Sequence, residues 1–134
     1  MKIPKNALIA VADGERLNLY HNSGDEHAPN LTALPDADVS TDNMGSGGRH
    51  QSSSANPSDS QQDEDSFAAG VTDVLNKRAM AGKIDHLIVI AAPRTLGELR
   101  KHYHKTLEAM LVGEISKDLT GHAIGDIEKT IAAA

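Results

Sequence analysis

Two short apolar patterns at the start of the chain predict a β-hairpin. Residues 7–13, ALIAVAD, are almost wholly apolar and end at Asp13-Gly14, a dipeptide that favours a tight turn. Residues 16–22, RLNLYHN, then alternate between apolar and polar side chains, which is typical of a half-buried strand. Residues 30–34, NLTAL, follow a proline and predict a third strand.

The second half of the chain alternates helical patterns with apolar runs. Such alternation is typical of a layered α/β domain. Apolar residues at helical spacing, or unbroken apolar runs, predict helix 60–82, strand 86–93, helix 95–111, strand 112–119 and helix 120–134.

Local signals suggest where two of these helices begin and end. Gly82 stands directly after the first helical pattern, where a glycine commonly ends a helix. Thr95 and Glu98 have the spacing of a capping box, in which each side chain bonds a backbone N–H of the first turn. The second helix is therefore expected to start at Thr95.

Together the patterns predict one α/β domain over residues 1–134, with a mixed β-sheet flanked by helices. Residues 87–92, LIVIAA, contain no polar position to give to solvent, so they predict a central strand covered on both faces. Residues 38–58 are rich in Ser, Asp, Asn and Gly and hold few apolar side chains. This segment predicts a long mobile loop, because it buries too little to offset its ordering entropy.

Composition and charge narrow the function classes. The chain has a formal net charge of −6 and no cysteine. Without a basic run, a general binder of nucleic acid or of anionic membranes is not expected, since such binding depends on phosphate neutralisation. One local basic contact stays open, and no DNA partner is predicted. The apolar run near the N-terminus is too short for a signal peptide or a membrane span, which predicts a cytoplasmic protein. Nothing in the pattern calls for a cofactor.

Seven histidines raise the question of a metal site. His102 and His104 lie two residues apart on a predicted helix, so they point to different faces and cannot chelate one ion together. No pair of histidines has the spacing of a zinc site. Surface histidines are the better interpretation, and no metal is predicted.

Acidic residues at predicted strand ends leave two interpretations open. Asp13 is either the turn residue that Asp-Gly hairpins prefer or the first acid of a two-metal nuclease site. The nuclease would need further acids from Asp85, Glu114 or Asp118 to converge on it. Lys117 and Asp118, at the end of a predicted strand, either cap the following turn or join Asp13 in a polar site.

A glycine-containing tip lies in the middle of the predicted loop. Its glycines permit unusual backbone angles, and its arginine can pair with phosphate as a planar fork. It is no phosphate-binding Walker motif, because it lacks Gly-Lys-Ser/Thr and no apolar strand leads into it. The segment is either an unstructured linker or a loop that reaches a partner through Gly47, Gly48, Arg49, His50 and Gln51.

Several runs together resemble the bacterial host attachment protein family ("protein required for attachment to host cells"). The most specific are Ala-Pro-x-x-Leu-Gly-x-Leu-Arg at 92–100 and Glu-Ile-x-Lys-Asp-Leu-Thr at 114–120. That family is in turn remotely similar to the middle domain of archaeal and eukaryotic peptide release factors. The resemblance implies a mixed sheet flanked by helices, with a long loop ahead of the long helix.

In release factors, the corresponding loop carries Gly-Gly-Gln and reaches the peptidyl-transferase centre. Here it reads Gly47-Gly48-Arg49-His50-Gln51, so two residues interrupt the tripeptide. The resemblance implies a factor associated with the ribosome or tRNA, and the interruption leaves enzymatic activity open. The alternatives are a non-catalytic regulatory or binding module that affects host attachment indirectly, and the metal-dependent nuclease.

Overall fold

The five predicted strands form one mixed sheet. The protein is described from a computed structural model, over residues 1–40 and 59–134. The strand order is β3-β2-β1-β4-β5, so β1 and β4 lie inside the sheet. The first three strands are antiparallel neighbours, whereas β1 with β4 and β4 with β5 are parallel pairs. The strands are β1 (Leu8–Ala12), β2 (Leu17–Asn22), β3 (Leu31–Ala33), β4 (Leu87–Ala91) and β5 (Leu111–Ser116).

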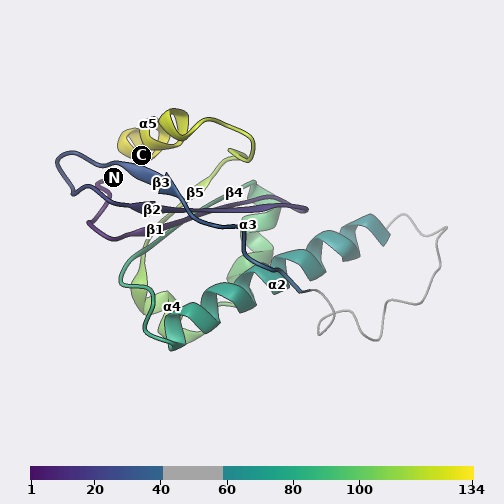
Figure 1. Cartoon of the computed structure of the whole chain (residues 1–134). Coiled ribbons are helices and arrows are strands. Elements are labelled where there is room, and N and C mark those ends of the chain that lie inside the picture. Colours follow the sequence, from purple (N-terminus) through teal and green to yellow (C-terminus); the bar gives the residue numbers. More distant parts are fainter. Residues whose placement is uncertain (41–58) are drawn as a thin grey trace.

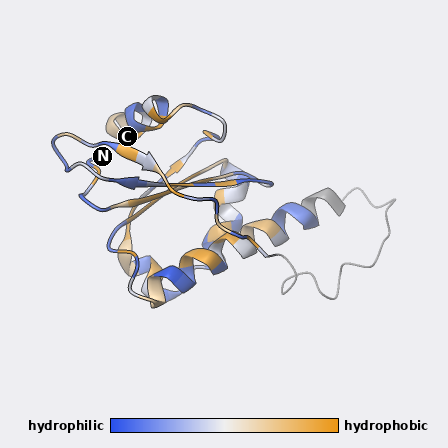
Figure 2. Ribbon diagram, viewed as in Figure 1, coloured by the Kyte–Doolittle hydropathy of each residue, from blue (hydrophilic) through white to orange (hydrophobic). Residues whose placement is uncertain are grey.

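Helices cover both faces of this sheet (Figure 1). The long helix α2 crosses one face together with α3 and α4, and α5 lies on the other face. Figure 2 shows hydrophobic and hydrophilic bands alternating along α2, as expected for a helix with one buried side. The helices are α2 (Asp59–Met80), α3 (Pro93–Arg100), α4 (Lys105–Met110) and α5 (Ile124–Ala133).

Strand β4 supplies side chains to both layers of the core. Leu87 and Val89 pack in the cluster that includes α2, α3 and α4, whereas Ile88 and Ile90 pack in the cluster that includes α5. All five residues of β4 are buried. The alternation explains why the run has no polar position, and it confirms the predicted α/β fold with an interior strand covered on both sides.

The predicted start of the second helix at Thr95 is wrong. Helix α3 begins at Pro93 with Ala92 as its N-cap, and no side chain caps it. Pro93 suits the first helical position, because its fixed φ is preorganised for a helix and it has no N–H to satisfy. Thr95 is instead buried within the first turn, so it makes no capping box with Glu98.

The predicted helix 95–111 is two helices with a link at residues 101–104. The backbone N–H of His102 bonds the carbonyl of Leu99, a three-residue spacing that closes α3. Asn76 of α2 then holds the link, donating to the carbonyl of His102 (3.0 Å) and accepting from the N–H of His104 (3.0 Å). The His104 side chain accepts from Thr106 N–H and caps α4.

Two glycines mark the ends of other elements. Gly82 has φ 74° directly after α2, and Lys83 N–H bonds the carbonyl of Arg78 across it, which confirms the predicted stop. Gly121 has φ 84°, and the last helix begins at Ile124 rather than at the predicted Thr120.

The segment predicted to be mobile, residues 38–58, is described only up to Ser40, and residues 41–58 lie outside the described part of the chain. Val39 packs against the core cluster of α2. A Cβ on Gly70 would lie 2.5 Å from the carbonyl oxygen of Ser40, so only a glycine lets the chain cross α2 this closely. Among the described helices, none is long and apolar enough to cross a membrane.

Candidate functional site

The parallel strands bring two of the predicted site residues to one edge of the sheet. β1, β4 and β5 run in the same direction, so their carboxyl ends meet at this edge. Asp13 follows directly after β1, and Asp118 comes two residues after the end of β5. In open α/β sheets, ligands commonly bind outside the carboxyl ends of the strands. This edge is therefore the first place to look for a site.

Asp13 organises the turn between β1 and β2. Its Oδ1 accepts hydrogen bonds from the backbone N–H groups of Glu15 (2.8 Å) and Arg16 (2.7 Å). Its Oδ2 accepts from the hydroxyl of Thr120 (2.8 Å) and lies 3.5 Å from the Arg16 guanidinium. The turn role predicted for an Asp-Gly hairpin is thus present, with a long-range contact added to it.

Thr120 joins the two acids. Its hydroxyl lies 2.7 Å from Oδ1 of Asp118, whose oxygen also accepts the Thr120 backbone N–H (3.2 Å). A hydroxyl has one hydrogen, so it can donate to only one carboxylate at a time. We call Asp13, Arg16, Asp118 and Thr120 the carboxyl-edge cluster.

Sequence reasoning found two members of this cluster and missed the others. Thr120 is 107 residues from Asp13, and its only local signal is the spacing from Asp118, which permits a side chain to bond the backbone two residues on. Lys117, the third residue of the predicted polar site, is exposed and makes no ion pair with any described residue. The structure therefore brings Asp13 and Asp118 together without Lys117.

The surroundings of Asp13 favour its charged form. Partial burial acts to raise the pKa of Asp13, but the hydrogen bonds from Glu15, Thr120 and Arg16, with the Arg16 charge, outweigh it and hold the pKa below its usual value. A group whose pKa is lowered by folding stabilises the fold while it is ionised. The carboxyl-edge cluster thus holds Asp13 as a stabilised carboxylate at the sheet edge.

Asp13→Asn is expected to lose this charge-dependent stability. The amide oxygen still accepts the two turn hydrogen bonds, so the change removes the charge together with the Oδ2 acceptor that faces Thr120. We expect the variant to be about 1 kcal/mol less stable than wild type at pH 7. The gap should close as the pH falls below the unfolded pKa of 3.8 and through the lower folded pKa. Urea unfolding at pH 7 and pH 3 measures it, and a gap that widens at pH 3 would contradict the assignment.

Of the three further acids that a two-metal nuclease could use, Asp118 meets Asp13 through Thr120, but Asp85 and Glu114 do not. Asp85 precedes β4, so it lies at the opposite edge of the parallel strands from Asp13. Glu114 pairs in register with Val89 and shares its face, where Arg100 Nη2 (2.8 Å) binds its carboxylate. Within residues 1–40 and 59–134, no three His, Asp or Glu side chains form a group that could hold a metal ion.

Glu114 instead ties β5 to the link between α3 and α4. Arg100 Nε (3.0 Å) bonds its Oε1, and the Tyr103 hydroxyl donates to its Oε2 (2.9 Å). Burial, followed by the hydrogen bond and charge of Glu114, raises the pKa of Tyr103 well above its usual range. Tyr103 therefore stays protonated and serves as a hydrogen-bond donor, and these groups have a structural role.

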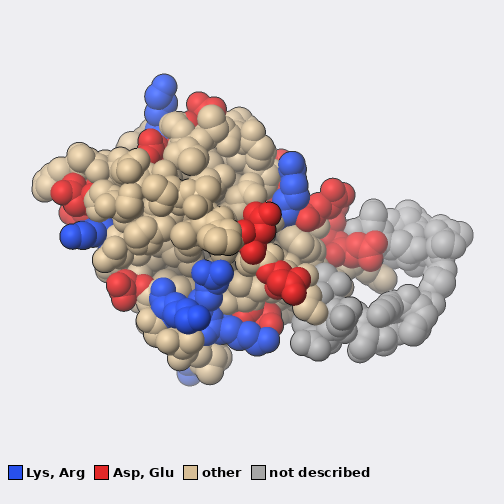
Figure 3. Space-filling view, viewed as in Figure 1, with Lys and Arg blue, Asp and Glu red and all other residues tan. Residues whose placement is uncertain are grey.

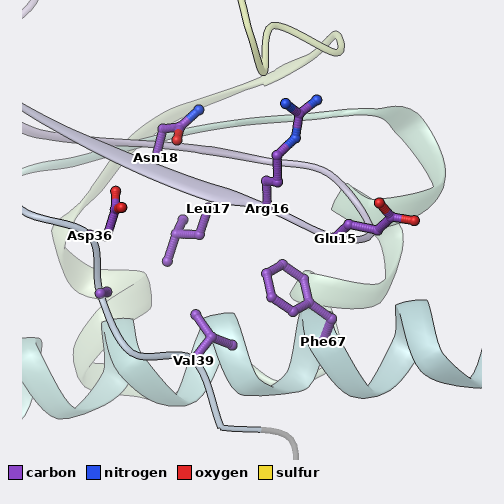
Figure 4. Close-up of a pocket in the computed structure, with 8 residues that line it drawn as sticks. Glu15, Arg16, Leu17, Asn18, Asp36, Val39 and Phe67 are labelled. Carbon is purple, nitrogen blue, oxygen red and sulfur yellow. The ribbon is translucent and has the colours of Figure 1, made fainter.

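A shallow pocket of about 350 Å³ lies beside the turn that Asp13 organises (Figure 4). Phe67 of α2 forms one wall and Val39 lies beside it, whereas the Arg16 side chain, from the turn before β2, points away from both. Its charged lining residues are two acids, Glu15 and Asp36, and one base, Arg16, so the pocket does not concentrate positive charge for an anion. The lining residues are Glu15, Arg16, Leu17, Asn18, Asp36, Ala37, Val39 and Phe67.

The five residues of the predicted loop contact, Gly47 to Gln51, lie outside the described residues. The structure therefore places only the flanks of that loop. Ser40 lies beside α2, and Asp59 is the first residue of α2.

Comparison with known proteins bears on the whole described domain. A protein-family model described as bacterial archaeo-eukaryotic release factor family 12 matches residues 6–131. No curated protein matches the chain. The match supports the release-factor relationship predicted from the sequence, whereas the host-attachment name stays a prediction.

Proposed function

Because the chain belongs to bacterial archaeo-eukaryotic release factor family 12, we propose that it is a translation factor that associates with the ribosome or tRNA through the loop tip Gly47 to Gln51. The carrying observation is the extent of the match, which includes both flanks of that loop. Membership in this family supports a translation-related role and a partner in the translation machinery. The specific partner and the contact residues are the proposal.

The position of the loop flanks supports this choice. Ser40 crosses α2 at Gly70, whereas α2 begins at Asp59, eleven residues earlier. At 1.5 Å per residue, the start of the helix lies about 16 Å beyond the crossing point. The first turns of α2 extend past the sheet (Figure 1). The second flank of the loop is therefore attached beyond the body of the domain, and the position of the loop between β3 and the long helix is the one that the release-factor resemblance implies.

The chemistry of the tip fits an RNA partner. Gly47 and Gly48 lack side chains, so a backbone can approach closely there. The Arg49 guanidinium can bind a phosphate with two parallel hydrogen bonds. The Gln51 amide offers both donors and an acceptor. Because Arg49 and His50 separate the glycines from the glutamine, we propose contact with the translation machinery rather than ester hydrolysis.

Cellular location and any effect on host attachment follow from this proposal. A factor that binds ribosomes or tRNA acts in the cytoplasm. An influence on attachment would then be indirect, through the translation of other proteins.

Ribosome co-sedimentation of three tip variants tests the proposal. We expect Gly48→Val, Arg49→Ala and Gln51→Ala to weaken co-sedimentation and to shift the free energy of unfolding by no more than about 0.5 kcal/mol. Arg49→Ala should also lower the salt slope of binding by about one, because one phosphate contact is lost. Ser54→Ala, in the same segment, is the matched control and should bind as wild type does.

Arg49→Lys separates charge from shape. It keeps the positive charge but loses the planar fork, so we expect it to retain the salt slope and lose affinity. If wild type does not sediment with ribosomes or bind tRNA, the proposal fails. Efficient hydrolysis of a peptidyl-tRNA mimic by the wild type would overturn the non-hydrolytic part alone.

A further inference from the structure

Positive charge is concentrated in one part of this acidic chain. Residues 77–105 hold seven of the 13 Lys and Arg and two of the 19 Asp and Glu, a net charge of +5. The remaining residues hold six Lys and Arg and 17 Asp and Glu, a net charge of −11, and the two parts sum to −6. The low overall charge therefore conceals a basic region.

The fold gathers most of these cations at the amino edge of the parallel strands. Lys77 and Arg78 form the last turn of α2, and Lys83 follows two residues before the strand-entry loop at Asp85. The N–H of Lys83 bonds the carbonyl of Arg78 (2.9 Å), which holds it against the helix end. We call Lys77, Arg78, Lys83, Lys101 and Lys105 the amino-edge basic patch.

Asn76 connects the two halves of this patch. It stands next to Lys77 on α2, and its amide bonds both the carbonyl of His102 and the N–H of His104. Lys101 and Lys105 flank those two histidines in the link and at the start of α4. Figure 3 shows Lys and Arg side chains gathered over the end of α2, whereas acidic side chains lie over its start.

Three of the five cations in the patch have no acidic partner among the described residues, and the other two pair with acids. Lys77 pairs with Asp73 (3.0 Å) and Lys101 with Glu98 (3.0 Å), but the two lysine side chains remain 73% and 69% exposed. Arg78, Lys83 and Lys105 make no ion pair with the described parts of the chain. Cations gathered on one surface bind an extended polyanion by releasing its counterions.

We propose that the amino-edge basic patch docks the phosphate backbone of RNA. The choice of RNA rests on the proposed translation role, in which RNA is the polyanion that this surface would meet. A membrane surface fits less well, because Met80 and Val112 are the large hydrophobic residues exposed in the described structure, too few for an inserted apolar face. Recognition through phosphates rather than stacked bases agrees with the scarcity of aromatic residues, 2% of the chain. The inference does not require the loop tip to make contact.

Binding of a fluorescein-labelled single-stranded RNA of about 20 nucleotides, followed by anisotropy over a range of salt, tests this proposal. The variant is Arg78→Gln, Lys83→Gln and Lys105→Gln together. Each lost phosphate contact lowers the salt slope by about 0.7 for single strands, so three should lower it by about 2. We also expect Kd at low salt to rise at least about tenfold.

The matched control is Lys2→Gln, Lys5→Gln and Lys129→Gln, three exposed lysines outside the patch whose loss changes the net charge equally. It should keep more of the wild-type affinity and slope than the patch variant does. Equal losses in both would mean that only net charge matters, and no loss in the patch variant would mean that RNA binds elsewhere. Either result overturns the proposal, as does tighter wild-type binding to polyglutamate or anionic vesicles.

Two further measurements keep the outcomes separate. Thermal melts of both triple variants should match wild type within a few degrees, so that a loss of binding cannot come from unfolding. Arg49→Ala is measured in the same RNA assay. If Arg49→Ala and its loop partners have no effect on ribosomes while the patch variant loses RNA binding, the loop proposal fails and the patch proposal stands.

Discussion

Leu87→Ala is expected to destabilise the protein by roughly 2–5 kcal/mol. The Leu87 side chain is fully buried at 0% exposure, in the core cluster that α2, α3 and α4 cover. Truncation removes its apolar burial and leaves a cavity, because neighbouring side chains in a packed core relax only in part. A loss of this size is a large fraction of the stability of a typical domain, roughly 5–15 kcal/mol.

Ile90→Ala tests the other layer in the same way. Ile90 is also fully buried, but it packs in the cluster that includes α5. We expect a similar loss of roughly 2–5 kcal/mol, and near-additivity in the double variant, because the two side chains point to opposite faces of β4. Val112→Ala on the edge strand β5, 39% exposed, is the control and should cost much less.

Urea unfolding measures all of these variants on one scale. Losses under about 1 kcal/mol for both Leu87→Ala and Ile90→Ala would contradict the burial of β4 on two faces. A loss in only one of them would mean that one helical layer contributes little to the core.

β4 could be predicted from the sequence because its signal is local. A run of six apolar residues has to be covered on both faces wherever it lies, so its burial follows without knowledge of its neighbours. The β1–β2 hairpin could be predicted for the same reason, since Asp13-Gly14 carries the turn and the flanking residues carry the periodicity.

The break between α3 and α4 could not be predicted, because helical spacing continues through it. Leu99, Tyr103 and Leu107 keep a helical period, yet the chain leaves the helix at Lys101. The cause lies elsewhere in the sequence, in the Asn76 amide and the Glu114 carboxylate that hold the link. Tertiary hydrogen bonds of this kind override a local pattern without leaving a mark on it.

The carboxyl-edge cluster likewise combines residues with a local sequence signal and a residue that only the fold makes significant. Turn chemistry singled out Asp13, and strand-end position singled out Asp118, but Thr120 became significant only when the parallel strands brought both acids to it. The basic patch was missed for a different reason. Its cations lie within residues 77–105 but other residues separate most of them, so no uninterrupted basic run appears, and the fold brings them together.

The buried Asn22 leads to the second large effect. It ends β2, is 0% exposed, and uses all of its amide atoms. Its Nδ2 donates to the carbonyls of Ile3 (3.0 Å) and Pro4 (3.0 Å), and its Oδ1 accepts the N–H groups of Gly24 (3.0 Å) and Asn30 (2.9 Å). One side chain therefore joins the N-terminal segment to the loop between β2 and β3.

Asn22→Ala is expected to cost roughly 2–4 kcal/mol in urea unfolding, because each buried backbone group left without a partner costs about 1–3 kcal/mol. Asn18→Ala, on the same strand, is the control and should stay within about 0.5 kcal/mol, because Asn18 is only partly buried and lines the open pocket.

Asn22→Asp distinguishes hydrogen bonding from simple packing. It preserves the shape and the oxygen that accepts from Gly24 and Asn30, but it turns a second oxygen toward the carbonyls of Ile3 and Pro4. A carboxylate there is buried and repelled, so protonation should relieve the cost, and the variant should be more unstable relative to wild type at pH 7 than near pH 4. If Asn22→Asp is as stable as wild type at pH 7, then Nδ2 is not the donor that holds the N-terminal segment.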